Sequence, residues 1–503
     1  MKFKTDNSIN RVLKNSGFVA FRFIIYTVSG FIFVPFLIGS FGTADYGLIA
    51  LAGFLTQYVG MISNCIGSSV ARFLNIALNK DDIYESNEIY NTALVSNIAL
   101  ILINIPVFAY CLYNLDIFFD FEIEKSQDLF ILVLCNVLVF FIALLTGVFK
   151  TSIQASNRID ISAKIDIIKI VVRLILIYAG VHYIGASLWI IGVVDLVLAL
   201  LSAIFFILIS GKLAPELVID RTHINKKWIS PVLKMSSWSL VGVLGFSLIT
   251  QTDTWLINRF VDKEVAGIFA ALLVWPNLVK QVTKQFESII APVLLIDFAK
   301  GNLKRFDNTL RYSSRFLASG GGIITGLLFV LVPFIVEYWL KVNDDSYSLL
   351  LYLMLFYLAL TLSESVLWRY FQISNKMNQN GIISIGTGLF NIVLSVVFIN
   401  FGYGYLGVAF ATSISLLIKD AVLVPVIICK NTSLKFSQFI NDYLISIFLM
   451  GFSYFGFSQI MAEILNGNMI NTLLFSMITI VLLIVFLIQA NKKLLVIIYS
   501  RFL

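Results

Sequence analysis

The chain has 503 residues, of which 59% are hydrophobic and only 13% are charged. Soluble domains usually carry about 25% charged residues, so this composition excludes a soluble enzyme and predicts an all-α, polytopic membrane protein. The formal net charge of +7 fits basic loops at the inner membrane surface, and no nucleic-acid partner is predicted. The four cysteines lie in or beside apolar stretches without a C-x-x-C motif, so neither disulfides nor a metal site are expected.

Stretches of about 20 apolar residues, the length that one crossing of a bilayer needs, recur along the chain. The basic start, MKFKTDNSINRVLKN, precedes an apolar stretch without a small-residue cleavage signal, so the first span is expected to stay uncleaved. Fourteen spans are predicted, near 17–39, 45–72, 89–113, 126–149, 164–184, 186–210, 236–259, 266–295, 316–340, 347–371, 381–400, 405–429, 438–461 and 469–489.

The basic residues indicate the orientation of the chain. Of 36 Lys and Arg, only Lys125, Arg259, Lys263 and Lys341 fall in loops that follow an odd-numbered span. Because cytoplasmic loops carry the excess of basic residues, both termini are predicted to be cytoplasmic. The outer loops are short, the longest running from 114 to 127, and none is large enough for a catalytic domain.

The two halves of the chain resemble each other at a spacing of about 220 residues. QASNR at 154–158 returns as QISNK at 372–376, and two shorter echoes occur in the same order in corresponding loops. Because six spans per repeat is an even number, the halves run parallel and are related by an axis along the membrane normal. We expect an N-terminal lobe at 1–211, a cytoplasmic linker at 212–235, a second lobe at 236–430, and two additional helices with a tail at 431–503.

The eighth span, 266–295, carries an unusual polar stripe. On a helix, five of its polar residues share one side: Asn277, Lys280, Gln281, Lys284 and Ser288. A lone charge in hydrocarbon costs at least roughly 2.5–3.5 kcal/mol, so this side must face a watery cavity or another helix. Pro276 stands four residues before Lys280, where a bend would change the direction of the lysine.

Three stretches and the repeated QxSN carry a family resemblance. GSFGTADYGLIAL at 39–51, QTDTWLINRF at 251–260 and EVAGIFAA at 264–271 resemble the polysaccharide flippases of the multidrug, oligosaccharidyl-lipid and polysaccharide exporter superfamily. The likeness covers nearly the whole chain, and none of the motifs is a catalytic signature. It implies two six-helix lobes in a V around a central lumen, extended here by spans thirteen and fourteen.

The resemblance also implies an activity. Such a flippase moves an undecaprenyl-diphosphate-linked oligosaccharide from the inner to the outer leaflet of the bacterial cytoplasmic membrane, and it is not an enzyme. The implied partners are this lipid-linked substrate, membrane lipids, and a polysaccharide polymerase or chain-length regulator. The identity of the glycan, whether O-antigen, capsule or teichoic acid, stays open.

An anionic diphosphate requires a wet passage with fixed positive charge, which lysine and arginine supply. Lys280 and Lys284 are the first candidates for lumen cations, with structural ion pairing and snorkelling to the inner headgroups as their alternatives. Arg173 and Lys419 could extend this surface, as could Arg22, for which an inner-leaflet anchor is favoured. Lys169 and Arg173 could instead form a salt-bridged face with Asp166, and the adjacent Asp420 is expected to point away from Lys419.

Transport against a gradient needs an energy source, and the chain has no G-x-x-x-x-G-K-[ST] loop for ATP. No cofactor is predicted, and antiport of H⁺ or Na⁺ is the remaining source. The leading carboxylate is Asp253, which has Gln251, Thr252 and Thr254 as oxygen-bearing neighbours in sequence. Its alternatives are pairing with a lumen lysine or capping a broken helix. Three other carboxylates at membrane depth are weaker candidates: Asp195, Glu287 and Glu364.

Other functions remain open at this point. An exporter of cationic drugs would be expected to have an acidic or aromatic lumen, whereas the candidate lysines favour an anion. A flippase for a peptidoglycan precursor is closer and harder to exclude. A membrane glycosyltransferase or polymerase would need outer carboxylates, and the outer segments supply few: Asp116, Asp120, Glu122 and Glu124. Gly320–Gly322 and Gly326 in the ninth span fit either a hinge or close helix packing.

Overall fold

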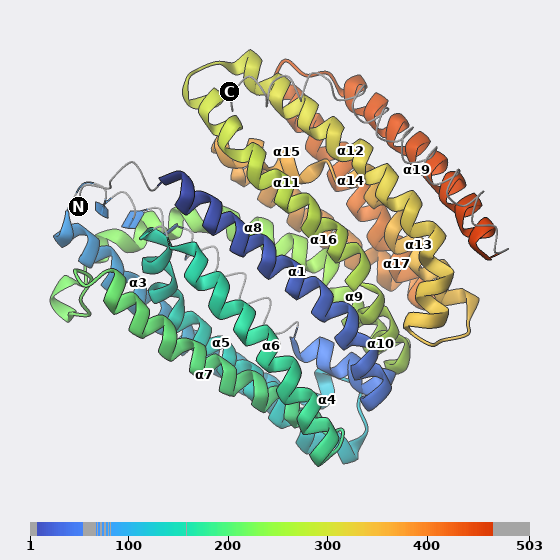
Figure 1. Cartoon of the computed structure of the whole chain (residues 1–503), viewed down its shortest axis with the longest axis horizontal. Helices are drawn as coiled ribbons and strands as arrows, with labels where there is room; N and C mark the ends of the chain where they lie inside the picture. Colours follow the sequence, from blue (N-terminus) through green and yellow to red (C-terminus); the bar gives the residue numbers. More distant parts are fainter. Residues whose placement is uncertain are drawn as a thin grey trace. The chain divides into compact units, whose positions relative to one another are not determined.

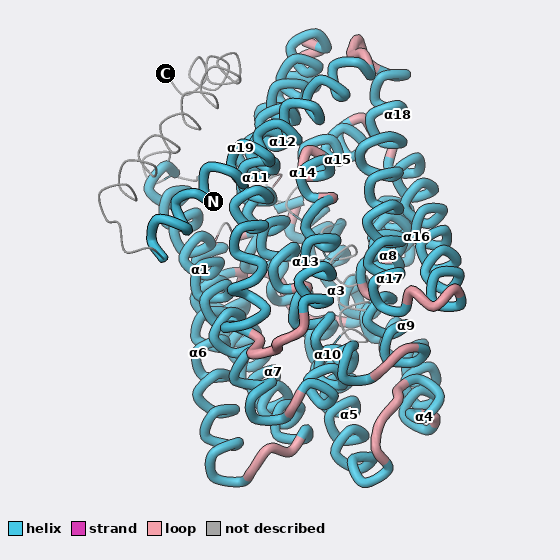
Figure 2. The backbone as a smooth tube through the Cα atoms, turned by 90° about the vertical axis from the view of Figure 1, so that its right-hand side faces the viewer, coloured by secondary structure: helices cyan, strands magenta, loops and turns pink. Residues whose placement is uncertain are grey.

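The computed structural model describes residues 8–465, apart from 54–66 and the single positions 68, 71, 72, 75, 76, 79, 81 and 157. Every regular element among these residues is a helix (Figure 2). This confirms the all-α prediction. Most of the second predicted span, 45–72, and the whole fourteenth, 469–489, lie outside the described residues.

Eleven of the described helices are long and apolar enough to cross a membrane, and a bent pair of helices makes a twelfth. This confirms a polytopic membrane protein. The number is compatible with fourteen predicted spans, because two of those spans fall mainly where the chain is not described.

The chain divides into two compact units, which are described separately. The N-terminal unit consists of Met1–Leu244 and Ile257–Ala270, and the C-terminal unit consists of Gly245–Leu256 and Ala271–Leu503. The division passes through three helices, α8 (Ile229–Thr250), α9 (Thr252–Phe260) and α10 (Lys263–Leu272), so each of them has residues in both units. The lobe boundaries expected from the sequence stay a prediction.

Long helices build the N-terminal unit. Its elements are α1 (Ser8–Phe41), α3 (Ile83–Tyr113), α4 (Leu115–Phe118), η2 (Ile123–Lys125), α5 (Ser126–Ala155), α6 (Ile159–Ile184), α7 (Leu188–Leu213), η3 (Arg221–His223), η4 (Lys226–Trp228) and α10 (Lys263–Leu272, to residue 270). α5 packs along α7, and α1 packs along α6 (Figure 1). Gly192 allows the first of these contacts, because a Cβ there would lie 3.0 Å from the Leu132 Cα.

The polar loop that follows α7 is tied to α3 by two asparagines one turn apart. Asn87 donates to the Glu216 carbonyl and accepts from the Val218 N–H. Asn91 repeats this pattern with the Val218 carbonyl and the Asp220 N–H. The two amides therefore satisfy the extended backbone as a neighbouring strand would, which orders the longest polar break in the sequence.

The C-terminal unit contains more interrupted helices. Its elements are α11 (Val274–Ala299), α12 (Leu303–Phe334), the π-helical η5 (Ile335–Trp339), α13 (Asp345–Phe356), α14 (Leu358–Thr361), α15 (Glu364–Ile373), α16 (Met377–Asn400), α17 (Gly404–Leu416), the π-helical η6 (Leu417–Leu423), α18 (Val424–Asn431) and α19 (Phe436–Leu465).

Several predicted spans are thus not single regular helices. The seventh breaks at Gln251 and the eighth at Leu273. The tenth bends by 50° between Thr361 and Glu364. Pro276 lies in the first turn of α11, three residues after the break, where its missing N–H leaves no helical hydrogen bond unmade.

Close packing accounts for two glycines of the ninth span. α12 runs along α19, and a Cβ at Gly322 would lie 2.1 Å from the Ser446 carbonyl oxygen. A Cβ at Gly326 would lie 2.3 Å from the Met450 carbonyl oxygen. These glycines are four residues apart on one face, so they let the two backbones touch. The same pair of helices buries an ion pair between Arg311 and Asp442.

We expect Gly322→Ala to destabilise the purified protein by about 1–3 kcal/mol, because the new methyl group meets a backbone carbonyl that cannot move aside easily. Gly320→Ala is the matched control, since nothing lies within 4 Å of its Cβ position and alanine favours a helix. Thermal unfolding in detergent measures both. Equal midpoints for the two variants would contradict close packing of α12 against α19.

Candidate functional site

The C-terminal unit gathers most of the charged residues that the sequence singles out. α11 carries Lys280, Lys284 and Glu287, while Glu364 begins α15. Lys419 lies in η6. The centroid of the Phe246 ring, near the end of α8, lies 5.4 Å from the Lys280 Nζ and 5.7 Å from the Lys419 Nζ. Lys280 of α11 and Lys419 of η6 therefore both lie over the same aromatic ring of α8.

Lys419 is buried in a network of opposite charges. Its Nζ lies 2.5 Å from an Asp420 oxygen and 3.6 Å from a Glu364 oxygen. The expectation that Asp420 points away from Lys419 is therefore wrong. The π-helical turn of η6 narrows the angle between successive side chains, and the long lysine side chain curls back to its neighbour. Lys419 is consequently not available to an anion in this structure.

Glu287 is also paired. It forms an ion pair with Arg369 of α15, whose guanidinium lies 5.3 Å from the centroid of the Trp368 ring. The sequence reasoning missed Arg369, although a basic residue at the inner end of the tenth span, five residues after Glu364, was a usable signal. The pair neutralises one predicted ion-coupling carboxylate.

Lys280 differs from these residues because it forms no ion pair with any carboxylate in the described ranges. Its Nζ lies over two rings, 5.0 Å from the Tyr357 centroid and 5.4 Å from the Phe246 centroid. Lys284, one turn further along α11, is exposed and forms no ion pair with a described residue either. Among the described residues, Lys280 therefore lacks the structural ion pair that was its alternative role.

The other described residues of the polar stripe are also exposed or half-buried. Asn277 is exposed and Gln281 is half-buried. The side chain of residue 288 is outside the described part of the chain. The polar stripe is thus not enclosed by apolar packing, as the cost of burying ammonium groups requires.

Asp253 occupies a separate, fully buried polar site. One of its oxygens lies 2.5 Å from the Thr412 hydroxyl, and the other accepts from Asn391 at 3.2 Å. Asn391 also donates to the Ile249 carbonyl, and its own oxygen accepts from Ser415 at 3.3 Å. No described basic side chain forms an ion pair with Asp253. The site therefore offers several oxygen atoms around one carboxylate.

Two of these partners were not found from the sequence. The expected neighbours were the adjacent Gln251, Thr252 and Thr254, whereas Asn391 comes from α16 and Thr412 from α17. Asn391, an amide in the middle of the apolar eleventh span, was a signal that a buried polar group needs a partner. Which partner it meets depends on helix packing, and sequence spacing does not contain that information.

The candidates of the N-terminal unit are paired between helices. Arg22 of α1 lies 2.6 Å from Asp166 of α6, and Arg173 makes two contacts, at 2.6 and 3.0 Å, with Asp195 of α7. The local salt-bridged face suggested for Lys169, Arg173 and Asp166 is therefore replaced by pairs that join neighbouring helices. Within the described residues, Asp195 is occupied by an arginine.

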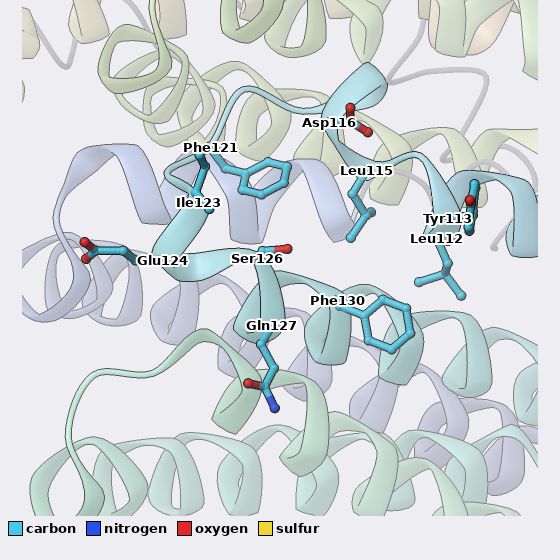
Figure 3. A pocket seen from close by; sticks show the side chains of 10 residues that line it. All are labelled: Leu112, Tyr113, Leu115, Asp116, Phe121, Ile123, Glu124, Ser126, Gln127 and Phe130. Atoms are coloured by element: carbon cyan, nitrogen blue, oxygen red, sulfur yellow. The ribbon is translucent and has the colours of Figure 1, made fainter.

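A cavity of about 590 Å³ lies along the segment between the end of α3 and the start of α5. Figure 3 shows the rings of Phe121 and Phe130 and the carboxyl groups of Asp116 and Glu124 among the side chains that line it. Glu122 lies 3.0 Å from Lys263, and this hydrogen-bonded ion pair lowers the pKa of the glutamate. No set of three His, Cys, Asp or Glu in the described ranges could hold a metal ion.

Comparisons with known proteins show the fold. No protein-family model matches the chain. The chain is 21% identical over 415 residues to the uncharacterized membrane protein EpsK of Bacillus subtilis (strain 168), covering 82% of this chain and 81% of that protein. The structure of the present chain is similar to that of the lipid II flippase MurJ in an inward closed conformation, with a TM-score of 0.69 and 16% identity. The match covers 97% of this chain and 100% of that one.

A second solved structure is similar over most of its length. It is a multidrug resistance MATE family transporter of the MOP superfamily in an inward-facing conformation, with a TM-score of 0.64, 11% identity, and coverage of 85% of this chain and 98% of that one. At these identities the likeness establishes a shared fold alone. The expected fold is confirmed at this level.

Lys419→Met is expected to destabilise the protein by about 3–5 kcal/mol, because it leaves the buried Asp420 and the nearby Glu364 without their counter-ion. Lys284→Met is the matched control and should change stability by no more than about 0.5 kcal/mol, since that side chain is exposed. Thermal unfolding of both purified variants measures this difference in stability. Equal stability would show that Lys419 is not part of a buried charge network.

Proposed function

We propose that this chain is a flippase that moves an undecaprenyl-diphosphate-linked oligosaccharide from the inner to the outer leaflet of the bacterial cytoplasmic membrane by alternating access. The observation that carries the proposal is the pair of ammonium groups on α11, Lys280 and Lys284, which no described carboxylate neutralises. The fold shared with transporters, among them a lipid II flippase, supports it. The product would serve a surface polysaccharide such as O-antigen or capsule.

The spacing of the two lysines suits a diphosphate. Positions four apart on a helix are separated by about 6 Å along its axis and lie on the same face. Two phosphates in series can therefore each meet one ammonium group. Asn277 and Gln281, on the same stripe, add amide donors and acceptors for sugar hydroxyl groups. The apolar polyprenyl chain would remain in lipid.

Asp253 is our candidate for cation coupling. A buried carboxylate that accepts from the Asn391 amide and lies beside the Thr412 hydroxyl oxygen can take up H⁺ or bind Na⁺. One charge that falls through 100 mV supplies about 2.3 kcal/mol, so antiport of such a cation could drive each transport cycle. Glu364, Glu287 and Asp195 are weaker candidates, because each already has a basic partner.

Two related functions remain as alternatives. A MATE-like exporter of cationic drugs is favoured by the similarity to a multidrug transporter, and a flippase for peptidoglycan precursors is favoured by the similarity to MurJ. The unpaired lysines support an anionic cargo over a cationic one. A polysaccharide polymerase or chain-length regulator is our proposed protein partner, and both termini are proposed to be cytoplasmic.

In proteoliposomes, the purified chain should move a labelled undecaprenyl-diphosphate oligosaccharide between leaflets. Lys280→Met and Lys284→Met should each slow this movement about 10-fold, because each removes a charge-assisted hydrogen bond of roughly 1.5–3 kcal/mol. Lys304→Met, an exposed lysine at the start of α12, is the control and should leave the rate unchanged. A wild type that leaves this lipid in place but extrudes a cationic dye would favour the drug exporter instead.

Asp253→Asn should abolish the response of transport to an imposed Na⁺ or pH gradient, because the amide keeps the shape of the side chain but cannot bind a cation by charge. Asp345→Asn, an exposed position in the first turn of α13, is the matched control. The rate is measured with and without each gradient. Gradient-driven transport that persists in Asp253→Asn would remove this residue from the coupling mechanism.

A further inference from the structure

Lys280 has defined contacts at its backbone carbonyl and at its ammonium group. Its backbone carbonyl accepts from the Thr283 hydroxyl at 2.8 Å, and that hydroxyl lies 3.2 Å from the Ser365 hydroxyl of α15. At the other end, the ammonium group lies 5.0 Å from the Tyr357 centroid and 5.4 Å from the Phe246 centroid. Both ring distances are within the range of a cation–π interaction.

The two rings are themselves fixed by packing. Gly245, which precedes Phe246, touches the backbone of α16, since a Cβ there would lie 2.3 Å from the Ser384 carbonyl carbon. Tyr357 is only 5% exposed and stands at the junction of α13 and α14. Its carbonyl accepts from two backbone N–H groups that follow it, which fixes the backbone at this junction. Neither ring is therefore a mobile surface group.

A comparison with Lys419 shows what the rings accomplish. Both lysines lie over Phe246, but Lys419 also meets two carboxyl groups that neutralise it. The Lys280 ammonium instead meets ring faces, which attract a cation through their quadrupole without carrying a negative charge. The rings themselves contribute no opposite charge, so this ammonium group can still attract an anionic ligand.

We propose that Phe246 and Tyr357 form an aromatic cage that positions the Lys280 ammonium for the phosphate of an anionic substrate without neutralising it. The cage residues are positioning residues, since they act through Lys280. This inference rests on the proposed flippase function and adds how its anion site is kept both ordered and charged. Preorganisation matters here because a free lysine side chain would lose rotamer freedom on binding.

The test uses farnesyl diphosphate as the probe, with the full chain in detergent. Tyr357→Leu and Phe246→Leu should each weaken its binding about 3–10-fold, the range that corresponds to one partly desolvated cation–π contact. Tyr357→Phe keeps the ring and should bind like the wild type. Phe356→Leu removes an adjacent ring that has no recorded contact with Lys280, and it controls for general effects of losing an aromatic side chain.

A second readout follows Lys280 itself. Acetic anhydride labelling, read by mass spectrometry, compares the rate at Lys280 with that at Lys284 in the same molecule. Loss of either caging ring should raise this ratio, because the ring no longer shields the Lys280 amine. Tyr357→Phe keeps the ring and should leave the ratio at its wild-type value. A merely structural role for the rings would change stability but not this ratio selectively.

The outcomes separate the cage from the proposed function. Weaker binding with a raised labelling ratio in both leucine variants, and neither change in Phe356→Leu, supports the cage. Wild-type binding and labelling in both leucine variants would overturn it, whether or not the chain transports lipid. A wild type that does not bind the probe would count against the anion site, while the labelling ratio would still decide whether the rings hold Lys280.

Discussion

The cost of an uncompensated charge at membrane depth governs the arrangement of this chain. Six of the nine charged candidates from the sequence meet an opposite charge from another segment: Arg22, Arg173, Asp195, Glu287, Glu364 and Lys419. Such pairs join α1 to α6, α6 to α7, α11 to α15, η6 to α15, and α12 to α19. The pairs act as polar contacts between helices whose remaining surfaces are apolar. They therefore fix which helices are neighbours and how far each is shifted along the axis of the next.

The other three candidates depart from this rule, each in a different way. Lys284 is exposed, Lys280 lies over two rings, and Asp253 is held by neutral hydrogen-bonding groups. None of the three forms an ion pair with a residue that the structure describes. A charge that is stabilised but not neutralised can still respond to a ligand. For that reason these residues, rather than the paired ones, carry the proposals on substrate and ion binding.

Helix irregularities place these groups. The break between α8 and α9 puts Phe246 in one helix and Asp253 at the start of the next. The π-helical turn of η6 brings Lys419 back onto its own neighbour, Asp420. The junction between α13 and α14 carries Tyr357. Each irregularity coincides with a functional candidate, which fits the frequent occurrence of π-bulges and broken membrane helices at binding sites.

The sequence by itself determined the membrane class, the helical architecture and the approximate position of every described span, because a bilayer requires apolar helices of a nearly fixed length. It also identified Lys280, Lys284 and Asp253 as unusual, since a charge within an apolar stretch is visible in one dimension. Only the tertiary structure decided which charges are neutralised. Arg369 meeting Glu287, Asp195 meeting Arg173, and Asn391 meeting Asp253 all depend on which helix faces pack together, and residues far apart in sequence meet there. The aromatic contacts of Lys280 were hidden for the same reason, because a phenylalanine or tyrosine in an apolar span has no sequence signal that separates a lipid-facing ring from one beneath an ammonium group.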